Sequence, residues 1–232
     1  FDLYFKLRKV FSSQKSEMID LNNFIQQNIK IFQPINLMGT ITSSHDQVRF
    51  MALADNQINL SENGRERSFY NLPQKVINSS SYDKLFMFST VNFMLPGIPV
   101  VYYGEEYGQI GANDPGNRLK MRFPYQWNSI EREYNEKYKK IVHLRHNNPA
   151  PALGDLVIIY QTNHCTVWLK RYFDKAVLVM FNYNSEPYSL KLDIDNQFKI
   201  ASSVLGQDSM ELNKSTSLLL GPYETRVYEL HN

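Results

Sequence analysis

The sequence is poor in the features that mark several common classes of protein. It has one cysteine, Cys165, in 232 residues, so it cannot form an internal disulfide framework. Its formal net charge is only +2, and its basic residues form no stripe, which argues against a nucleic-acid-binding protein. No apolar run approaches the length of a membrane span, and the N-terminus lacks a signal-peptide pattern. We therefore expect neither nucleic acid nor a membrane among its partners, and the compartment stays open.

Signatures of several reaction types are missing as well. The five histidines are scattered, so no metal-binding constellation stands out. No segment matches a phosphate-binding loop, a dinucleotide-binding fingerprint or a nucleophile elbow. We therefore expect residues of this chain to hold no metal ion and no organic cofactor.

The chain is long enough and apolar enough to bury a core. Its residues are 43% hydrophobic and 13% aromatic, which suits one large domain or two small ones. It begins with Phe1, in the middle of a pattern of alternating apolar and basic residues, rather than with methionine. We expect it to be a piece of a longer protein.

The first two thirds of the chain alternate between helical periodicity and short apolar runs. Residues 35–42 and 98–103 are such runs, and the second is apolar on both faces, which is typical of a strand buried in a parallel sheet. Helices are expected over residues 1–12, 20–32, 83–95 and 130–146. The helix at 83–95 is apolar almost all round, which predicts a buried helix. Residues 55–81 form a polar, irregular excursion between a strand and a helix, and loops of that length are often functional or mobile.

The character of the sequence changes at residues 147–151. From Gly154 onward, short β-rich runs are separated by turn residues with no helical pattern between them, which is typical of an antiparallel sandwich. The runs are 156–161, 165–172, 176–183, 188–192, 199–204, 218–220 and 226–230. We place a domain boundary near residue 153, so that residues 1–153 form one domain and residues 154–232 an all-β domain.

The polar residues that follow the two strands are the candidate site, because active sites of strand–helix barrels lie at the carboxyl ends of the strands. Asp46 can accept hydrogen bonds from two vicinal sugar hydroxyls, and His45 beside it can donate a third. Asp114 and Arg118, four residues apart after a glycine-rich turn, could form a fork over a sugar's hydroxyls. Both pairs also admit a structural interpretation, Asp46 as a helix N-cap and the second pair as an ion pair that shapes its own loop.

Glu105 and Glu106 do not qualify as an acid and base pair. Neighbouring residues of an extended segment point in opposite directions, so the two carboxylates cannot face one bond together. We expect structural or hydrogen-bonding roles for them. Tyr102 and Tyr103 are expected to pack in a core, with a stacking role in the site as the alternative for one of them.

Three motifs and a junction resemble, in this order, those of the α-amylase family (glycoside hydrolase family 13). They are residues 44–49 (Ser-His-Asp-Gln-Val-Arg), 95–106, 111–118 and 144–154, and the resemblance covers at least residues 39–154. After residue 155 the likeness is limited to a β-rich C-terminal domain. The resemblance implies an α/β fold, namely the C-terminal part of a (β/α)8 TIM barrel from about strand 6 or 7 to strand 8, followed by an antiparallel β-sandwich.

The resemblance also implies roles for the candidate residues. His45 and Asp46 would follow the seventh barrel strand and stabilise the transition state in the −1 subsite. Asp114 and Arg118, after the eighth strand, would contact the neighbouring sugar of an α-glucan or maltooligosaccharide on its non-reducing side. Two features depart from the family. Ser44 stands where asparagine is usual, and the excursion at 55–81 is longer than in compact members and could shape substrate entry.

The retaining mechanism of the family needs a carboxylate nucleophile and a carboxylic acid/base. The resemblance places both on strands upstream of Phe1, so we expect a glycoside hydrolase fragment that is inactive without the missing N-terminal half. Two strands cannot close a barrel, so we also expect exposed strand edges and an exposed apolar helix at 83–95. Calcium is frequent in the family, but its usual ligands would lie mainly in the missing half.

Two other functions remain open. A non-catalytic relative would keep the barrel as a scaffold for binding or partner docking, and a transglycosylase or isomerase of the same family would differ only in its loops. The presence of all four site residues, His45, Asp46, Asp114 and Arg118, favours an enzyme, because a scaffold has no chemical need for them.

Overall fold

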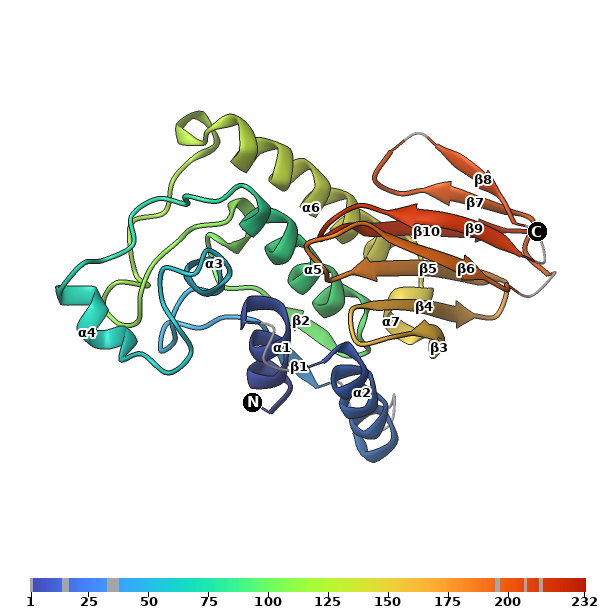
Figure 1. Cartoon of the computed structure of the whole chain (residues 1–232), viewed down its shortest axis with the longest axis horizontal. Helices are drawn as coiled ribbons and strands as arrows, with labels where there is room; N and C mark the ends of the chain where they lie inside the picture. Colours follow the sequence, from blue (N-terminus) through green and yellow to red (C-terminus); the bar gives the residue numbers. More distant parts are fainter. Residues whose placement is uncertain (1, 14–16, 33–37, 195–196, 207, 213–214) are drawn as a thin grey trace. The chain divides into compact units, whose positions relative to one another are not determined.

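The computed structural model describes residues 2–13, 17–32, 38–194, 197–206, 208–212 and 215–232 (Figure 1). They form two compact units, each considered by itself below. The first takes helix α1 (Asp2–Ser13) with residues 39–92 and 98–139, and the second takes helix α2 (Met18–Phe32) with residues 93–97 and 140–232. The domain boundary near residue 153 stays a prediction. Within the described ranges, no helix has both the length and the apolarity to span a bilayer.

The first unit contains one pair of parallel strands. Strands β1 (Gly39–Ile41) and β2 (Ile98–Val100) pair in register from Gly39 opposite Ile98 to Ile41 opposite Val100. Both strands are shorter than predicted, and residues 35–37 of the first prediction lie outside the described residues. The prediction that the second strand is buried on both faces is wrong here, since Ile98 is 54% exposed. A sheet of two strands leaves each strand with an unpaired edge and little cover for its faces.

Helix α5 (Ser80–Met94) forms the centre of the first unit. Its apolar side chains at Leu85, Phe88 and Val91 are almost fully buried, which confirms the burial predicted from its apolar pattern. The exposure expected from an incomplete barrel is wrong. The reason is that other helices cover it. The ring of Phe88 stacks on Phe50 of helix α3 (Phe50–Ala54), with ring centroids 3.9 Å apart, and meets Phe11 of α1 edge-on.

Helix α6 (Ser129–Asn147) covers a further side of α5 within the first unit. Tyr134 of α6 packs edge-on against Phe86, and its hydroxyl lies 3.2 Å from the hydroxyl of Ser89. The predicted helices at 83–95 and 130–146 are therefore confirmed to within a few residues.

The excursion at residues 55–81 is more ordered than predicted. It contains helix α4 (Gly64–Phe69), which begins after Asn63, whose side chain accepts hydrogen bonds from the amides of Arg65 and Glu66. The two ends of the excursion are tied together by the buried carboxylate of Asp55, which accepts hydrogen bonds from the amides of Ile77 and Asn78, both at 2.8 Å. A helix of six residues without an apolar stripe gives no periodic signal, so the pattern analysis missed it.

The second unit is built on two antiparallel sheets. The larger has the strand order β3-β4-β5-β10-β7-β8, and the smaller pairs β6 with β9 (Figure 1). The strands are β3 (Asp155–Gln161), β4 (Cys165–Tyr172), β5 (Lys175–Asn182), β6 (Tyr188–Leu192), β7 (Ile200–Ser203), β8 (Ser209–Glu211), β9 (Thr216–Leu220) and β10 (Thr225–His231). The seven predicted strands are present, and β8 was not predicted.

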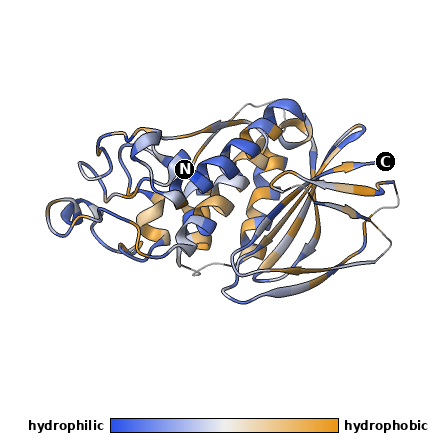
Figure 2. Cartoon of the chain, turned by 90° about the horizontal axis from the view of Figure 1, so that it is seen from above, coloured by the Kyte–Doolittle hydropathy of each residue, from blue (hydrophilic) through white to orange (hydrophobic). Residues whose placement is uncertain are grey.

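One apolar core lies between these sheets. It includes Leu178 and Met180 from β5, Leu190 and Leu192 from β6, and Leu220 from β9. Figure 2 shows hydrophobic and hydrophilic residues interspersed along the strands, as expected where one face of a sheet is buried and the other is not. The antiparallel β-domain predicted from the sequence is therefore present.

Helix α2 and the short helix α7 (Ala150–Leu153) pack against the large sheet within the second unit. The buried side chain of Asn22 joins α2 to two strands. Its amide donates to Thr166 at 2.9 Å and to Gln161 at 3.0 Å, and its carbonyl oxygen accepts from the indole of Trp168 at 2.9 Å. All of the hydrogen-bonding groups of this buried amide are in use, so the polar contact fixes where the helix lies.

Lys170 of β4 is a buried charged residue of the second unit. Its side chain is fully buried, and its ammonium group has no hydrogen-bond partner among the described residues. Burial, with a smaller contribution from the nearby charge of Arg145, lowers the pKa of Lys170 from 10.5 to about 8. Because the unfolded chain binds this proton more tightly than the folded chain, folding is penalised below pH 8 and relieved as the pH rises toward 10.5.

Replacement of this lysine therefore has a pH-dependent effect. We expect Lys170→Met to raise the free energy of unfolding at pH 7 by about 2–3 kcal/mol, and the gain to shrink as the pH approaches 10.5. Urea unfolding of both proteins at pH 7 and pH 10 measures this difference. Lys191→Met, at an exposed lysine of β6, is the control and should change little at either pH. A loss of stability at pH 7 in Lys170→Met would contradict the account.

Candidate functional site

Two polar turns leave the same edge of the parallel pair. The carboxyl ends of parallel strands meet at one edge of a sheet, so the chain after Ile41 and the chain after Val100 depart from the same side. The first turn holds His45 and Asp46. The second strand leads through the short 3-10 helix η1 (Glu105–Tyr107) to the loop that contains Asp114 and Arg118.

The structure brings the four predicted site residues together. The Nε atom of Arg118 lies 3.0 Å from a carboxylate oxygen of Asp114, and its Nη2 atom lies 3.6 Å from a carboxylate oxygen of Asp46. The second carboxylate oxygen of Asp46 is 3.2 Å from Nε2 of His45. Arg118 thus connects the two turns, and the carboxylates of Asp46 and Asp114 converge on one guanidinium group.

These polar contacts are open to solvent. The side chain of Asp46 is 67% exposed and that of His45 is 62% exposed. Ion pairs between exposed groups contribute little to stability and exchange readily with water or with a ligand. The same carboxylate and guanidinium groups can therefore exchange these contacts for hydrogen bonds to ligand hydroxyls at little cost.

The buried side chain of Asn117 is hydrogen-bonded to the backbone of the first turn. Its side-chain amide donates to the carbonyl oxygen of His45 at 2.7 Å and to that of Gln47 at 2.8 Å. Ser44, at the position where the resemblance expects asparagine, accepts a hydrogen bond from the amide of Asp46 at 3.3 Å. The turn that presents His45 and Asp46 is held on both sides of these residues.

The buried side chain of Arg49 joins the loop of Asn117 to the segment that follows β2. Its Nε donates to the carbonyl oxygen of Asn117 at 3.0 Å, and its Nη1 donates to the carbonyl oxygen of Tyr103. The guanidinium lies over the rings of Tyr102 and Tyr103, 4.2 Å and 4.6 Å from their centroids. Arg49 and Asn117 therefore position the site, and the two tyrosines pack against Arg49.

Sequence reasoning missed the roles of Arg49 and Asn117. Both residues belong to the motifs that were singled out, but an arginine and an asparagine in polar segments are usually exposed. Nothing in the order of the residues distinguishes these buried donors from their exposed neighbours, because their partners are backbone carbonyls of segments far apart in the sequence.

Glu105 is buried and is not part of the charged cluster. It begins η1, so the expectation of an extended segment is wrong, whereas the expected hydrogen-bonding role is observed. Its carboxylate accepts a hydrogen bond from the hydroxyl of Thr42 at 2.9 Å and from the amide of Tyr102 at 3.4 Å. Burial raises the pKa of Glu105 above its usual value, and the hydrogen bond from Thr42 and the charges of Arg8 and Arg49 partly oppose this rise.

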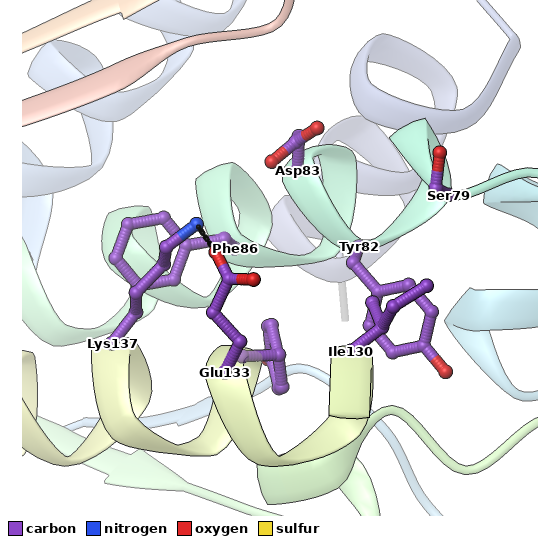
Figure 3. Close-up of a pocket in the computed structure, with 8 residues that line it drawn as sticks. Ser79, Tyr82, Asp83, Phe86, Ile130, Glu133 and Lys137 are labelled. Carbon is purple, nitrogen blue, oxygen red and sulfur yellow. Dashed lines mark ion pairs between the residues drawn. The ribbon is translucent and has the colours of Figure 1, made fainter. Parts of the chain in front are cut away.

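A separate cavity of about 180 Å³ lies between α5 and α6 and contains none of the four site residues (Figure 3). Its wall is half aromatic or aliphatic and half polar or charged, and the ammonium group of Lys137 is paired with Glu133 at 2.9 Å. The lining residues are Ser79, Tyr82, Asp83, Phe86, Ile130, Glu133, Tyr134 and Lys137. Across the described part of the chain, no three histidine, cysteine or acidic side chains cluster as metal ligands would.

Comparison with known proteins identifies relatives of this arrangement. No family model matches the chain. The maltogenic α-amylase of Bacillus acidopullulyticus is 27% identical over 139 residues, which are 57% of this chain and 23% of that protein. The cyclomaltodextrin glucanotransferase of Thermoanaerobacterium thermosulfurigenes is 27% identical over 179 residues, 77% of this chain and 21% of that protein.

Solved structures agree with the sequence relatives. The α-amylase of Anoxybacillus is 25% identical and superposes with a TM-score of 0.80, covering 100% of this chain and 46% of its own. The chain is similar to enzymes of the α-amylase family. The α-amylase of Geobacillus thermoleovorans, solved with acarbose, is also 25% identical, with a TM-score of 0.79 and coverage of 100% and 47%. The chain therefore spans just under half the length of these two solved relatives and about a fifth of the two sequence relatives.

The buried amide of Asn117 provides a test of how the site is positioned. We expect Asn117→Asp to lower the free energy of unfolding by about 2–4 kcal/mol, because a carboxylate would face the carbonyl oxygens of His45 and Gln47 without a proton to donate. Asn113→Asp is the matched control in the same loop. The side chain of Asn113 accepts a hydrogen bond from the amide of Asp114 at 2.7 Å, and a carboxylate preserves that bond. Urea unfolding at pH 7 that gives equal losses for both variants would contradict the assignment.

Proposed function

We propose that the chain is the C-terminal part of a retaining glycoside hydrolase that acts on α-glucans such as maltooligosaccharides. In this proposal β1 and β2 are the seventh and eighth strands of a (β/α)8 barrel, and the all-β domain from residue 154 follows it. Three observations support it: the strands are parallel, helix α5, which precedes β2, is buried, and both strands are followed by polar turns at one edge. The relatives' names, which include α-amylases and glucanotransferases, support the substrate class.

The convergence of Asp46 and Asp114 on Arg118 is the observation on which the proposal rests. A glycosidic bond breaks through a transition state that resembles an oxocarbenium ion, with positive charge on the sugar ring. In the proposal, the carboxylate of Asp46 stabilises this charge and His45 donates a hydrogen bond to the same sugar. Asp114 and Arg118 bind the hydroxyls of the next sugar on the non-reducing side, and Arg118 also orients the carboxylate of Asp46.

The nucleophile and the acid/base lie, in this proposal, outside these 232 residues. A retaining mechanism places these two carboxyl groups on opposite sides of the scissile bond, about 5–5.5 Å apart. Asp46 and Asp114 share one guanidinium group, so they are arranged to bind neighbouring sugars rather than to face each other across a bond. The 232-residue chain would then bind oligosaccharides without cleaving them.

The first test uses the chain by itself. We expect no release of reducing sugar when the 232 residues are incubated with maltohexaose. In the proposal, Asp46 stabilises the transition state and does not act as the nucleophile. A reducing-sugar assay measures this directly, and the Asp46→Asn variant sets the background. Turnover by the chain that disappears in Asp46→Asn would contradict the proposal that the other two carboxylates are elsewhere.

The second test separates the two carboxylates in a protein in which this chain is joined to the remaining strands of the barrel. We expect Asp46→Asn to lower kcat by roughly 10²–10³-fold with little change in KM, because its charge acts mainly on the transition state. Asp114→Asn should instead raise KM roughly tenfold and affect kcat less, since it removes a ground-state contact. Steady-state kinetics with maltohexaose measures both, and the reverse pattern would exclude these roles.

A further inference from the structure

The excursion at residues 55–81 exposes two consecutive aromatic side chains. Phe69 is the last residue of α4 and is 65% exposed, and Tyr70, which follows it, is 72% exposed. Single exposed aromatic residues are common, whereas here two follow each other in the sequence.

The residue before this aromatic pair is bonded to the loop that carries Asp114. The hydroxyl of Ser68 donates to the carbonyl oxygen of Asn113 and accepts from the amide of Gly116 at 3.3 Å. The amide of Asn113 donates to the carbonyl oxygen of Gly64 at 3.1 Å. Helix α4 is therefore bonded to the residues on both sides of Asp114 and Pro115.

Two glycines show how closely the excursion packs against the site. A Cβ atom on Gly64 would lie 2.4 Å from Val48, which is two residues after Asp46. A Cβ atom on Gly116 would lie 2.6 Å from Leu72 of the excursion. Neither position has room for a larger side chain, so α4 is in contact with the turn of Asp46 and with the loop of Asp114.

The backbone that presents the two rings is held in place. The amide of Tyr70 donates to the carbonyl oxygen of Glu66 at 3.0 Å, and the guanidinium of Arg67 reaches the carbonyl oxygen of Asn71 at 3.4 Å. Arg67 is in turn paired with Glu62 at 2.7 Å. The rings are therefore exposed on an ordered turn, and a ligand that covers them does not need to order the backbone first.

We propose that Phe69 and Tyr70 form an aromatic platform that binds the sugars of a maltooligosaccharide beyond the one held by Asp114 and Arg118. A pyranose ring has an apolar face of C–H groups that packs on a flat aromatic ring while its hydroxyls stay in water. This chemistry suits two exposed aromatic rings. The proposal rests on the proposed function and adds to it a preference for long substrates: in it, Phe69 and Tyr70 bind sugars that a disaccharide held by Asp46 and Asp114 does not have.

The experiment is a titration of the isotopically labelled 232-residue chain with maltose and with maltohexaose, followed by NMR. We expect maltohexaose to bind roughly tenfold more tightly than maltose and to shift the amide resonances of Phe69, Tyr70 and Asn71. Maltose should shift only resonances near Asp46 and Arg118. In the double variant Phe69→Ala and Tyr70→Ala, the affinity for maltohexaose should fall to that for maltose, and the affinity for maltose should stay unchanged.

Two further variants make each outcome decisive. Phe173→Ala removes an aromatic residue of similar exposure, 79%, from the turn between β4 and β5, and should bind both sugars as the original chain does. Arg118→Ala should lower the affinity for maltose and the affinity for maltohexaose by the same factor. The platform is excluded, while the proposed function stands, if the double variant keeps the original affinity for maltohexaose. It is excluded as well if Phe173→Ala lowers this affinity as much as the double variant does. If the folded chain binds neither sugar, the proposed function fails and the platform fails with it.

Discussion

The buried guanidinium of Arg49 is the constraint on which the candidate site depends. It is bonded to carbonyl oxygens of Tyr103 and Asn117, and Asn117 in turn is bonded to the carbonyl oxygens of His45 and Gln47. A guanidinium is planar and always charged, and it presents several donors in fixed directions, so it can hold separate backbone segments at a defined spacing. The exposed side chains of the site owe their positions to these buried donors rather than to their own ion pairs, which are weak in water.

Periodicity was sufficient to predict most elements of the fold. The apolar pattern of α5, the striped pattern of α6 and the alternating runs of the β-domain each match the structure to within a few residues. Burial was harder to predict. Ile98 and Val100 have the composition of a buried strand, but burial depends on which strands and helices lie against them. Helix α5 is buried, as its apolar pattern predicts, because rings from α1, α3 and α6 cover it; the exposure expected from an incomplete barrel is not observed.

The sequence predicted the exposed residues of the candidate site but not the buried residues that position them. The order of the motifs was enough to predict that Asp46 and Arg118 lie in one site, because the carboxyl ends of parallel strands lie at the same edge of a sheet. The partners of Arg49 and Asn117 are backbone carbonyls, which every residue has, so no residue type in the sequence marks them. Helix α4 was missed for a related reason: its stability comes from the cap at Asn63 and from packing at Gly64, and both are local features without a period.

The carboxylate of Asp55 closes the excursion at its base. It accepts hydrogen bonds from Ile77, Asn78 and Ser81, and these bonds, together with that from Gln57, outweigh the effect of burial and lower the pKa of Asp55. A loop whose ends are fastened to each other can change in length at little entropic cost to the rest of the molecule. The segment between these ends can thus be exchanged as a unit in evolution. Proteins with the same fold could then differ in the surface around the site while the residues of the site stay the same.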